Sequence, residues 1–320
     1  MILGRFCGCY QVMGSTHQAQ ITLATERPRS ITSAYRSFWI AIGILALCFS
    51  RVRFDLVNHA LNESLHSHII LVPFITASLV WQLRDSFPPP QRSGFAFPGA
   101  FAVVGILSII AYIVLHLSGR IPSHNDYLSF TVFSFCMFFF AIAAFFLGIT
   151  FVKRIAFPLF FLLVLVPLPD AATAAIEIVS QYASAETYSW FMNLSGATYY
   201  REGRTFVLPN LTIVVAQECS GIRSSLVLFI TSLIAGHLFL RSPSKKAILA
   251  LAVFPLGILR NAFRIYFLSM ASAHWDPNII HSPLHHRGGP IFFALSLIPF
   301  FLLLLWLKKS EQSASPKPVA

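Results

Sequence analysis

The residues with the clearest capacity for chemistry lie in Ala216–Ser225, where a polar stretch passes into a long apolar run. Cys219 stands at or just before the first turn of an expected helix. Unpaired backbone N–H groups and the helix dipole at such a position favour a thiolate over a thiol. Gly221 allows close approach of backbone or substrate, and Ser220 is suited to cap the helix. These residues leave two interpretations open, a nucleophilic thiol or a small buried cysteine.

Two arginines stand four residues apart in a later apolar run, Arg260 and Arg264, and so share one face of the expected helix. A charge inside a membrane span is costly and usually faces a cavity, a partner or a functional site. Counted from a cytoplasmic start near residue 246, Arg264 lies about 27 Å along the axis, at the depth of Cys219. We expect a functional role for Arg264 and a structural or snorkelling role for Arg260.

A histidine-rich loop, His281–Pro290, joins the last two apolar runs. Together with Cys219 and Arg264, it brings a thiol, an imidazole and a guanidinium to one predicted membrane face. The three groups suit a nucleophile, a proton carrier and a stabiliser of negative charge. A zinc site on the histidines is the alternative. We expect no metal, because no His-Glu-x-x-His motif is present and carboxylates are scarce nearby. His66 and His68, on the same face, are expected to be solvated loop residues.

Composition places these residues in a membrane protein. The chain of 320 residues is 56% hydrophobic and 11% charged, with a mean hydropathy of +0.70. A water-soluble fold cannot bury so much apolar surface beneath so few charges. Apolar runs of about 18 to 25 residues match the thickness of a bilayer core, and about eight are present. The expected spans are 35–52, 66–83, 96–117, 128–150, one between Arg154 and Pro167, 222–240, 246–272 and 289–307.

The basic residues indicate the orientation. A net charge of +11 is explained by Lys and Arg in cytoplasmic loops, so we expect no nucleic-acid partner. A cytoplasmic N-terminus places most of these residues on the cytoplasmic side, including Lys153–Arg154, Lys245–Lys246 and Lys308–Lys309. Both termini are then cytoplasmic, while Cys219 and the histidine loop are extracytoplasmic.

The segment of about 168–218 is too mixed in polarity to span a membrane. An amphipathic helix is expected from Asp170 to Asn193, and β-branched residues predict short strands at Thr205–Leu208 and Leu211–Ala216. The sequence thus predicts an all-α polytopic membrane protein with a small extracytoplasmic α/β cap between helices five and six. The expected parts are a flexible cytoplasmic lead-in (1–33), a single membrane domain (34–310) and a cytoplasmic tail (311–320).

Three motifs, in this order, resemble the exosortase/archaeosortase family of membrane-embedded cysteine transpeptidases. They are Glu218–Ser224, Asn261–Ile265 and His285 four residues before Gly289, and Pro167–Pro169 is also similar to family members. The resemblance covers roughly residues 155–305. It implies that Cys219 is the nucleophile, Arg264 the transition-state stabiliser and His285 the acid/base.

Neighbouring residues qualify these assignments. Glu218 and Arg223 flank the thiol and either tune it or support the fold. His286 adjoins His285 and is the alternative acid/base. Pro290 departs from the family, which often has an aromatic residue at that position.

The resemblance also implies an activity and a location. The family removes a C-terminal sorting tail, made of a short motif, a transmembrane helix and a basic end, from secreted proteins. The cut protein is released or joined to an acceptor, here expected to be a lipid or polysaccharide. We expect a multi-pass protein among the lipids of a bacterial cytoplasmic (inner) membrane, without a cofactor. The alternatives are a non-enzymatic transporter or anion-binding membrane protein that uses Arg260 and Arg264, and a zinc-dependent membrane hydrolase.

Overall fold

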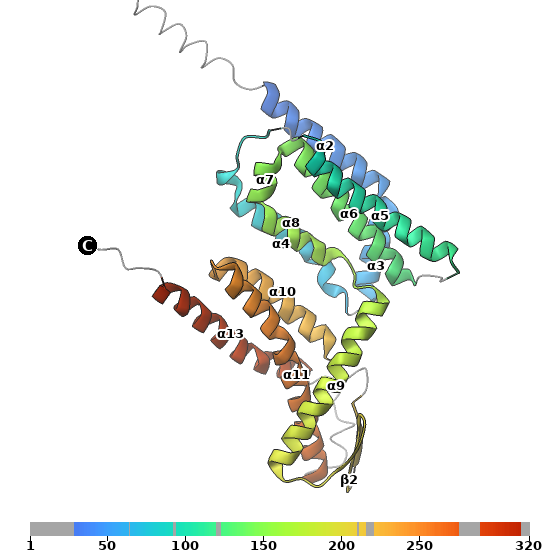
Figure 1. The fold of residues 1–320 in the computed structure, drawn as a ribbon, viewed down its shortest axis with the longest axis vertical. Helices are drawn as coiled ribbons and strands as arrows, with labels where there is room; N and C mark the ends of the chain where they lie inside the picture. Colours follow the sequence, from blue (N-terminus) through green and yellow to red (C-terminus); the bar gives the residue numbers. More distant parts are fainter. Residues whose placement is uncertain are drawn as a thin grey trace, which may run out of the picture.

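The computed structural model describes residues 29–63, 65–91, 94–119, 123–209, 211–215, 221–274 and 289–314. Its helices form two groups along the long axis of the molecule (Figure 1). The first group comprises α2 (Arg29–Cys48), α3 (Ser50–Asn62), α4 (Val72–Gln82), α5 (Ala96–Leu117), α6 (His124–Leu147), α7 (Ile149–Arg154) and α8 (Ala156–Leu162). The second comprises α9 (Asp170–Ser195), α10 (Ile222–Phe239), α11 (Pro243–His274) and α13 (Gly289–Ala314), with a small sheet at its far end.

Helix α6 is the centre of the first group, packed against α2, α3 and α5. Its apolar side chains supply much of the core, and Leu128 and Cys136 are fully buried. Ser123 caps the helix by accepting a hydrogen bond from the backbone N–H of Asp126. The helix ends at Gly148, whose φ is 92° and whose Cβ, if present, would overlap with the carbonyl oxygen of Gln91. Only glycine fits there.

A three-stranded antiparallel sheet packs on α9 and α11. Its spatial order follows the sequence, β1 (Tyr200–Glu202), β2 (Thr205–Leu208) and β3 (Leu211–Val214). Phe206 of the central strand is fully buried. It packs in one cluster with Tyr188 of α9, with Ala262 of α11 and with Val215, which follows β3. Helix α9 and this sheet form the small α/β cap, as the name is used below.

The chain is an all-α polytopic membrane protein with one small sheet. In the described residues, α5, α6, α10, α11 and α13 are long and apolar enough to cross a membrane. A sixth candidate is the pair Ala156–Leu165 and Asp170–Ser195, whose two helices meet at 90°. The bend falls at Pro167–Pro169, where the sequence predicts the end of a span, because proline fixes φ and lacks an N–H donor.

The predicted spans all fall on helices, yet two are shorter than predicted. The first, 35–52, divides between α2 and α3, and its apolar part covers Ser33–Cys48. The second, 66–83, consists of a 3₁₀ turn, η1 (Ser67–Ile70), and α4. Arg51, Arg53 and Asp55 end the first apolar run early. Length and composition therefore support five or six crossings in the described residues rather than about eight.

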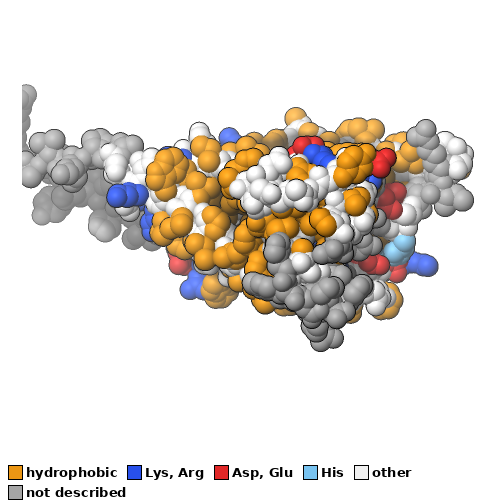
Figure 2. All heavy atoms as spheres, turned by 90° about the horizontal axis from the view of Figure 1, so that it is seen from below, with side chains coloured by type: hydrophobic (Ala, Val, Ile, Leu, Met, Phe, Trp, Pro, Cys, Tyr) orange, Lys and Arg blue, Asp and Glu red, His pale blue; other side chains and the backbone are white. Residues whose placement is uncertain are grey.

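Large apolar side chains remain exposed on these helices. Leu47 is 74% exposed, Phe74 71% and Leu117 78%. Figure 2, viewed from the end that carries the sheet, also shows hydrophobic side chains over much of the described surface. Lipid tails provide an apolar environment for such side chains, so this surface fits a protein embedded in a bilayer.

Candidate active site

The first turn of α10 is built around Gly221, the residue that precedes the helix. Its φ of 66° lies in the left-handed region. Its carbonyl oxygen accepts hydrogen bonds from the N–H of Ser225 (3.0 Å), the hydroxyl of Ser224 (3.1 Å) and Nη2 of Arg260 (3.1 Å). A Cβ atom at position 221 would lie 3.1 Å from the same Nη2. This position therefore requires glycine both for its conformation and for space.

Arg260 of α11 is buried against α10, with 8% of its surface exposed. Its Nη2 also donates to the hydroxyl oxygen of Ser225 at 3.3 Å. Nη1 is buried and has no hydrogen-bond partner among the described residues. One turn earlier, Gly257 lets α10 come close, because a Cβ there would overlap with Oγ of Ser225. The guanidinium thus lies between two helices and does not extend into solvent as a snorkelling arginine would.

Arg264 follows Arg260 by one helical turn on the same face of α11 and is half-buried. Arg223, in the first turn of α10, is exposed. The other residues predicted for the site lie outside the described residues; they are Glu218, Cys219, His285 and His286.

The start of α13 lies against the same part of α11. The ring of Phe292, in the first turn of α13, packs edge-on against Phe263 and Phe267, with ring centroids 6.4 and 6.1 Å apart. Phe263 directly precedes Arg264. Since α10 begins against Arg260, the starts of two helices converge on one stretch of α11. The motif around His285 and Gly289 does not include Phe292. The signal that could have found it is its aromatic side chain, because aromatic rings bury a large area when helices pack.

Asn261, the neighbour of Arg260, joins α11 to the cap. Its Nδ2 donates to Oγ of Ser184 in α9 at 3.0 Å, and the two residues are 2% and 0% exposed. Further along both helices, the hydroxyl of Tyr188 donates to Oγ of Ser269 at 3.1 Å. These two buried bonds hold α9 beside the stretch of α11 that carries both arginines. Asn261 belongs to one of the motifs that carry the family resemblance, and in the structure it bonds α11 to α9.

Residues 60–302 match the family model described as a transmembrane exosortase. The chain belongs to the transmembrane exosortase family. The match extends the resemblance seen over 155–305 toward the N-terminus, so that it includes α4, α5 and α6. Comparisons with curated proteins and with solved structures gave no match. Family membership makes this exosortase a multi-pass membrane protein of the protease/transpeptidase kind.

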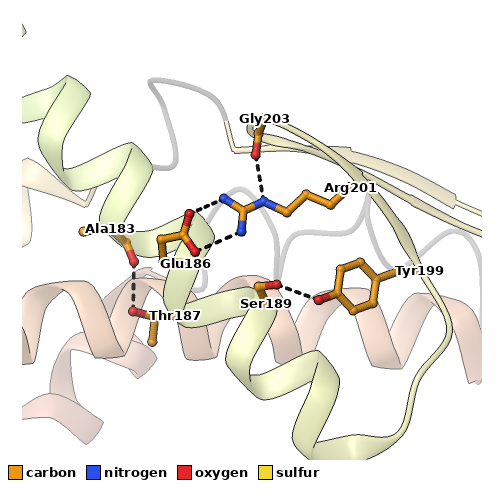
Figure 3. A network of polar contacts seen from close by, with 7 residues as sticks. All are labelled: Ala183, Glu186, Thr187, Ser189, Tyr199, Arg201 and Gly203. Carbon is orange, nitrogen blue, oxygen red and sulfur yellow. Dashed lines mark hydrogen bonds and ion pairs between the residues drawn. The ribbon is translucent and has the colours of Figure 1, made fainter.

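An ion pair fastens the sheet of the exosortase cap to α9 (Figure 3). Arg201 of β1 donates from Nη1 and Nη2 to the two carboxylate oxygens of Glu186, and from Nε to the carbonyl oxygen of Gly203. Hydrogen bonding to Glu186 raises the pKa of Arg201. The hydroxyls of Ser189 and Tyr199 are 2.6 Å apart. This network fixes the strands from which the chain continues toward α10.

A second group of titratable residues in the exosortase joins α3 to η1. Nε2 of His59 and Nδ1 of His66 are 3.1 Å apart, and His66 is 6% exposed. Desolvation, with smaller contributions from His59 and His68, lowers the pKa of His66 to about 4. The prediction of a solvated loop residue is therefore wrong for His66, because packing against α3 buries it. The described part of the chain contains no group of three or more His, Cys, Asp or Glu that is placed to hold a metal.

Proposed function

We propose that this exosortase is a cysteine peptidase/transpeptidase that cleaves the C-terminal sorting tail of secreted proteins. The main support is the convergence of the starts of α10 and α13 on the Arg260–Arg264 stretch of α11. Cys219 precedes α10 by three residues, and His285 precedes α13 by four. One stretch of α11 therefore lies beside the two helix starts from which a nucleophile and an acid/base are supplied. Family membership supports the kind of reaction.

The proposed reaction proceeds through a thioester. The thiol of Cys219 gives its proton to His285, and the thiolate attacks the carbonyl carbon of the scissile peptide. A C–S bond forms and an electron pair moves to the carbonyl oxygen, where Arg264 stabilises the charge. When this intermediate collapses, the C–N bond breaks and His285 returns its proton to the leaving amine. Water or a nucleophilic group of an acceptor then takes the acyl group and releases the thiol.

Two features of the described residues suit this chemistry. The N–H groups in the first turn of α10 have no acceptor within the helix and form the positive end of its dipole. Arg264 is half-buried, and a charge acts more strongly on a neighbouring anion where less water screens it. Supporting roles are assigned to Glu218 and Arg223, which flank Cys219 in the sequence, and to His286, which follows His285.

We place the reaction at the extracytoplasmic face of a bacterial cytoplasmic (inner) membrane, with both termini in the cytoplasm. The bias of Lys and Arg toward short loops supports this orientation. At the opposite end of α10 from Gly221, the backbone N–H of Arg241 donates to Glu311, and Lys245 donates to Ser310 of α13. Basic residues thus gather at the end away from the candidate site. The substrates are secreted proteins with a motif, a transmembrane helix and a basic end, and the acceptor is a lipid or polysaccharide.

Replacement of Cys219 tests this proposal in the native host. With Cys219→Ala, secreted proteins that carry the tail are expected to accumulate uncut. Cys48→Ala is the matched control, because Cys48 is an exposed thiol of α2, and it is expected to leave processing unchanged. Normal processing by Cys219→Ala, with the variant present at the wild-type level, would overturn the proposal.

A second candidate function is a non-enzymatic transporter or anion-binding protein that uses Arg260 and Arg264. The observation that favours it is the buried Nη1 of Arg260, which has no partner among the described residues. In this case Cys219→Ala is silent, and substitution of either arginine abolishes uptake of the ligand. The two candidates therefore differ in their response to a single cysteine variant.

A further inference from the structure

Arg260 is a buried cation for which the described residues supply no carboxylate. Removing a guanidinium from water is costly unless an opposite charge or a full set of hydrogen bonds replaces the solvent. Ion pairs in the described part of the chain involve other side chains, such as Arg51–Asp55, Arg84–Asp85 and Arg201–Glu186. Among the described residues this buried cation has no compensating charge, which calls for a function that requires its charge.

The hydrogen bonds of Arg260 divide its guanidinium into two parts. Nη2 is used, since it donates to the carbonyl oxygen of Gly221 and to the hydroxyl of Ser225. Nη1 is buried and unused among the described residues. One part of the group therefore fixes the turn that leads into α10, while the other part retains donors for a further acceptor.

The location of the charge indicates what that acceptor is. The first-turn N–H groups of α10 and the guanidinium of Arg260 are two independent sources of positive potential at one helix start. Cys219 is two residues before Gly221, so their Cα atoms lie within about 7.6 Å whatever path the chain takes. A thiolate at position 219 therefore belongs to a residue only two positions before the turn that Arg260 holds.

We propose that Arg260 is a positioning residue of the exosortase reaction, which fixes the turn leading into α10 and keeps a positive charge beside the Cys219 thiolate. This inference rests on the proposed function. The task differs from that of Arg264, which acts on the oxygen of the substrate carbonyl. Arg260 acts on the attacking group before substrate is bound.

A purely structural arginine would behave differently from one whose charge is used. If Arg260 only holds Gly221 and Ser225, a neutral side chain that donates one hydrogen bond replaces part of its effect, and the reactivity of the thiol keeps its dependence on pH. If its charge favours the thiolate, a neutral replacement shifts that dependence to higher pH even when the fold is intact.

The test measures the rate at which iodoacetamide alkylates Cys219 as a function of pH, in the full-length protein purified in detergent. The alkylated peptide is followed by mass spectrometry, and its signal is normalised to that of a cysteine-free peptide from the same digest. The variants are Arg260→Gln, which keeps a donor without charge, and Arg260→Lys, which keeps the charge. Thermal melting of each variant reports on the fold separately.

The expected result is that Arg260→Gln shifts the midpoint upward by about one pH unit, which slows alkylation near pH 7 by about tenfold. Arg260→Lys is expected to retain most of the wild-type profile. An unchanged midpoint in a folded Arg260→Gln overturns the inference. If Arg260→Gln does not fold, the result for Arg260→Lys is used instead. A folded Arg260→Lys whose alkylation midpoint rises by about one pH unit overturns the inference. Loss of processing in Cys219→Ala with an unshifted Arg260→Gln would leave the proposed function standing and remove only this inference.

Discussion

Nη2 of Arg260 lies 3.1 Å from the carbonyl oxygen of Gly221, so a charged side chain of α11 holds the turn from which α10 begins. The contact joins two segments that are 39 residues apart in the sequence. The same stretch of α11 receives the start of α13 through Phe263 and Phe292. Helix α11 thus contacts the starts of both α10 and α13, the helices that follow the proposed nucleophile and acid/base in the sequence.

Gly221→Ala is expected to destabilise the protein and to reduce processing. A left-handed conformation costs an alanine about 1–2 kcal/mol, and its Cβ would also press on Nη2 of Arg260. The matched control is Gly196→Ala, because Gly196 has a φ of 70° and open space around its Cβ position. Thermal melting is expected to show a larger loss for Gly221→Ala. Equal losses in the two variants would contradict the close contact with Arg260.

Asn261 and Ser184 are expected to be energetically coupled. Asn261→Ala leaves the buried hydroxyl of Ser184 without its donor, at a cost of about 1–3 kcal/mol. The double variant Asn261→Ala/Ser184→Ala is expected to lose less than the sum of the single losses. Chemical denaturation of the four proteins measures the coupling. Additive losses would show that the bond between α9 and α11 does not contribute.

Phe292→Ala is expected to impair processing through position, since the proposed reaction gives Phe292 no chemical role. Loss of its ring frees the start of α13 from Phe263 and Phe267, and a displacement of about 1 Å at a reacting group costs up to about 100-fold in rate. Phe301→Ala is the control, because Phe301 of the same helix is 45% exposed. Rates of substrate cleavage for the two variants are compared at equal protein levels. Similar rates would contradict the role of this packing.

Acidification is expected to destabilise the protein through His66. Burial lowers the pKa of His66 to about 4 from 6.5, so the folded state favours the neutral ring. The stability that depends on the neutral ring is complete above pH 6.5 and is lost as the pH falls toward 4. His66→Asn is expected to show a smaller drop in melting temperature between pH 7 and 5 than the wild type. His116→Asn, at an exposed site, is the control and is expected to show the same drop in melting temperature as the wild type. A drop as large as that of the wild type in His66→Asn would refute the prediction.

Local sequence properties predict much of this fold. Apolar runs locate the helices, Pro167–Pro169 marks the 90° bend, and β-branched residues locate β2 and β3. Such signals act within a few residues, which is why they succeed. The length of the first span is misjudged because the apolar run ends before the helical region does, as α3 continues with Arg51, Arg53 and Asp55.

Contacts between elements that are far apart in the sequence cannot be predicted from such local signals. The burial of Arg260 depends on the close packing of α10 at Gly257, and the His59–His66 pair depends on how the chain turns after α3. Spacing predicts that Arg260 and Arg264 share a helix face, but it does not say which of them contacts α10. The resemblance supplied roles for Cys219, Arg264 and His285, and these roles stay predictions.

Trapping the acyl intermediate tests the central claim most directly. Purified exosortase is mixed with a tailed secreted protein from its host, quenched in acid, digested and examined by mass spectrometry. The account predicts a substrate fragment attached through a thioester to the peptide that contains Cys219, released by hydroxylamine and missing in Cys219→Ala. Cleavage of the substrate by Cys219→Ala at the wild-type rate, or an adduct on another residue, would contradict it.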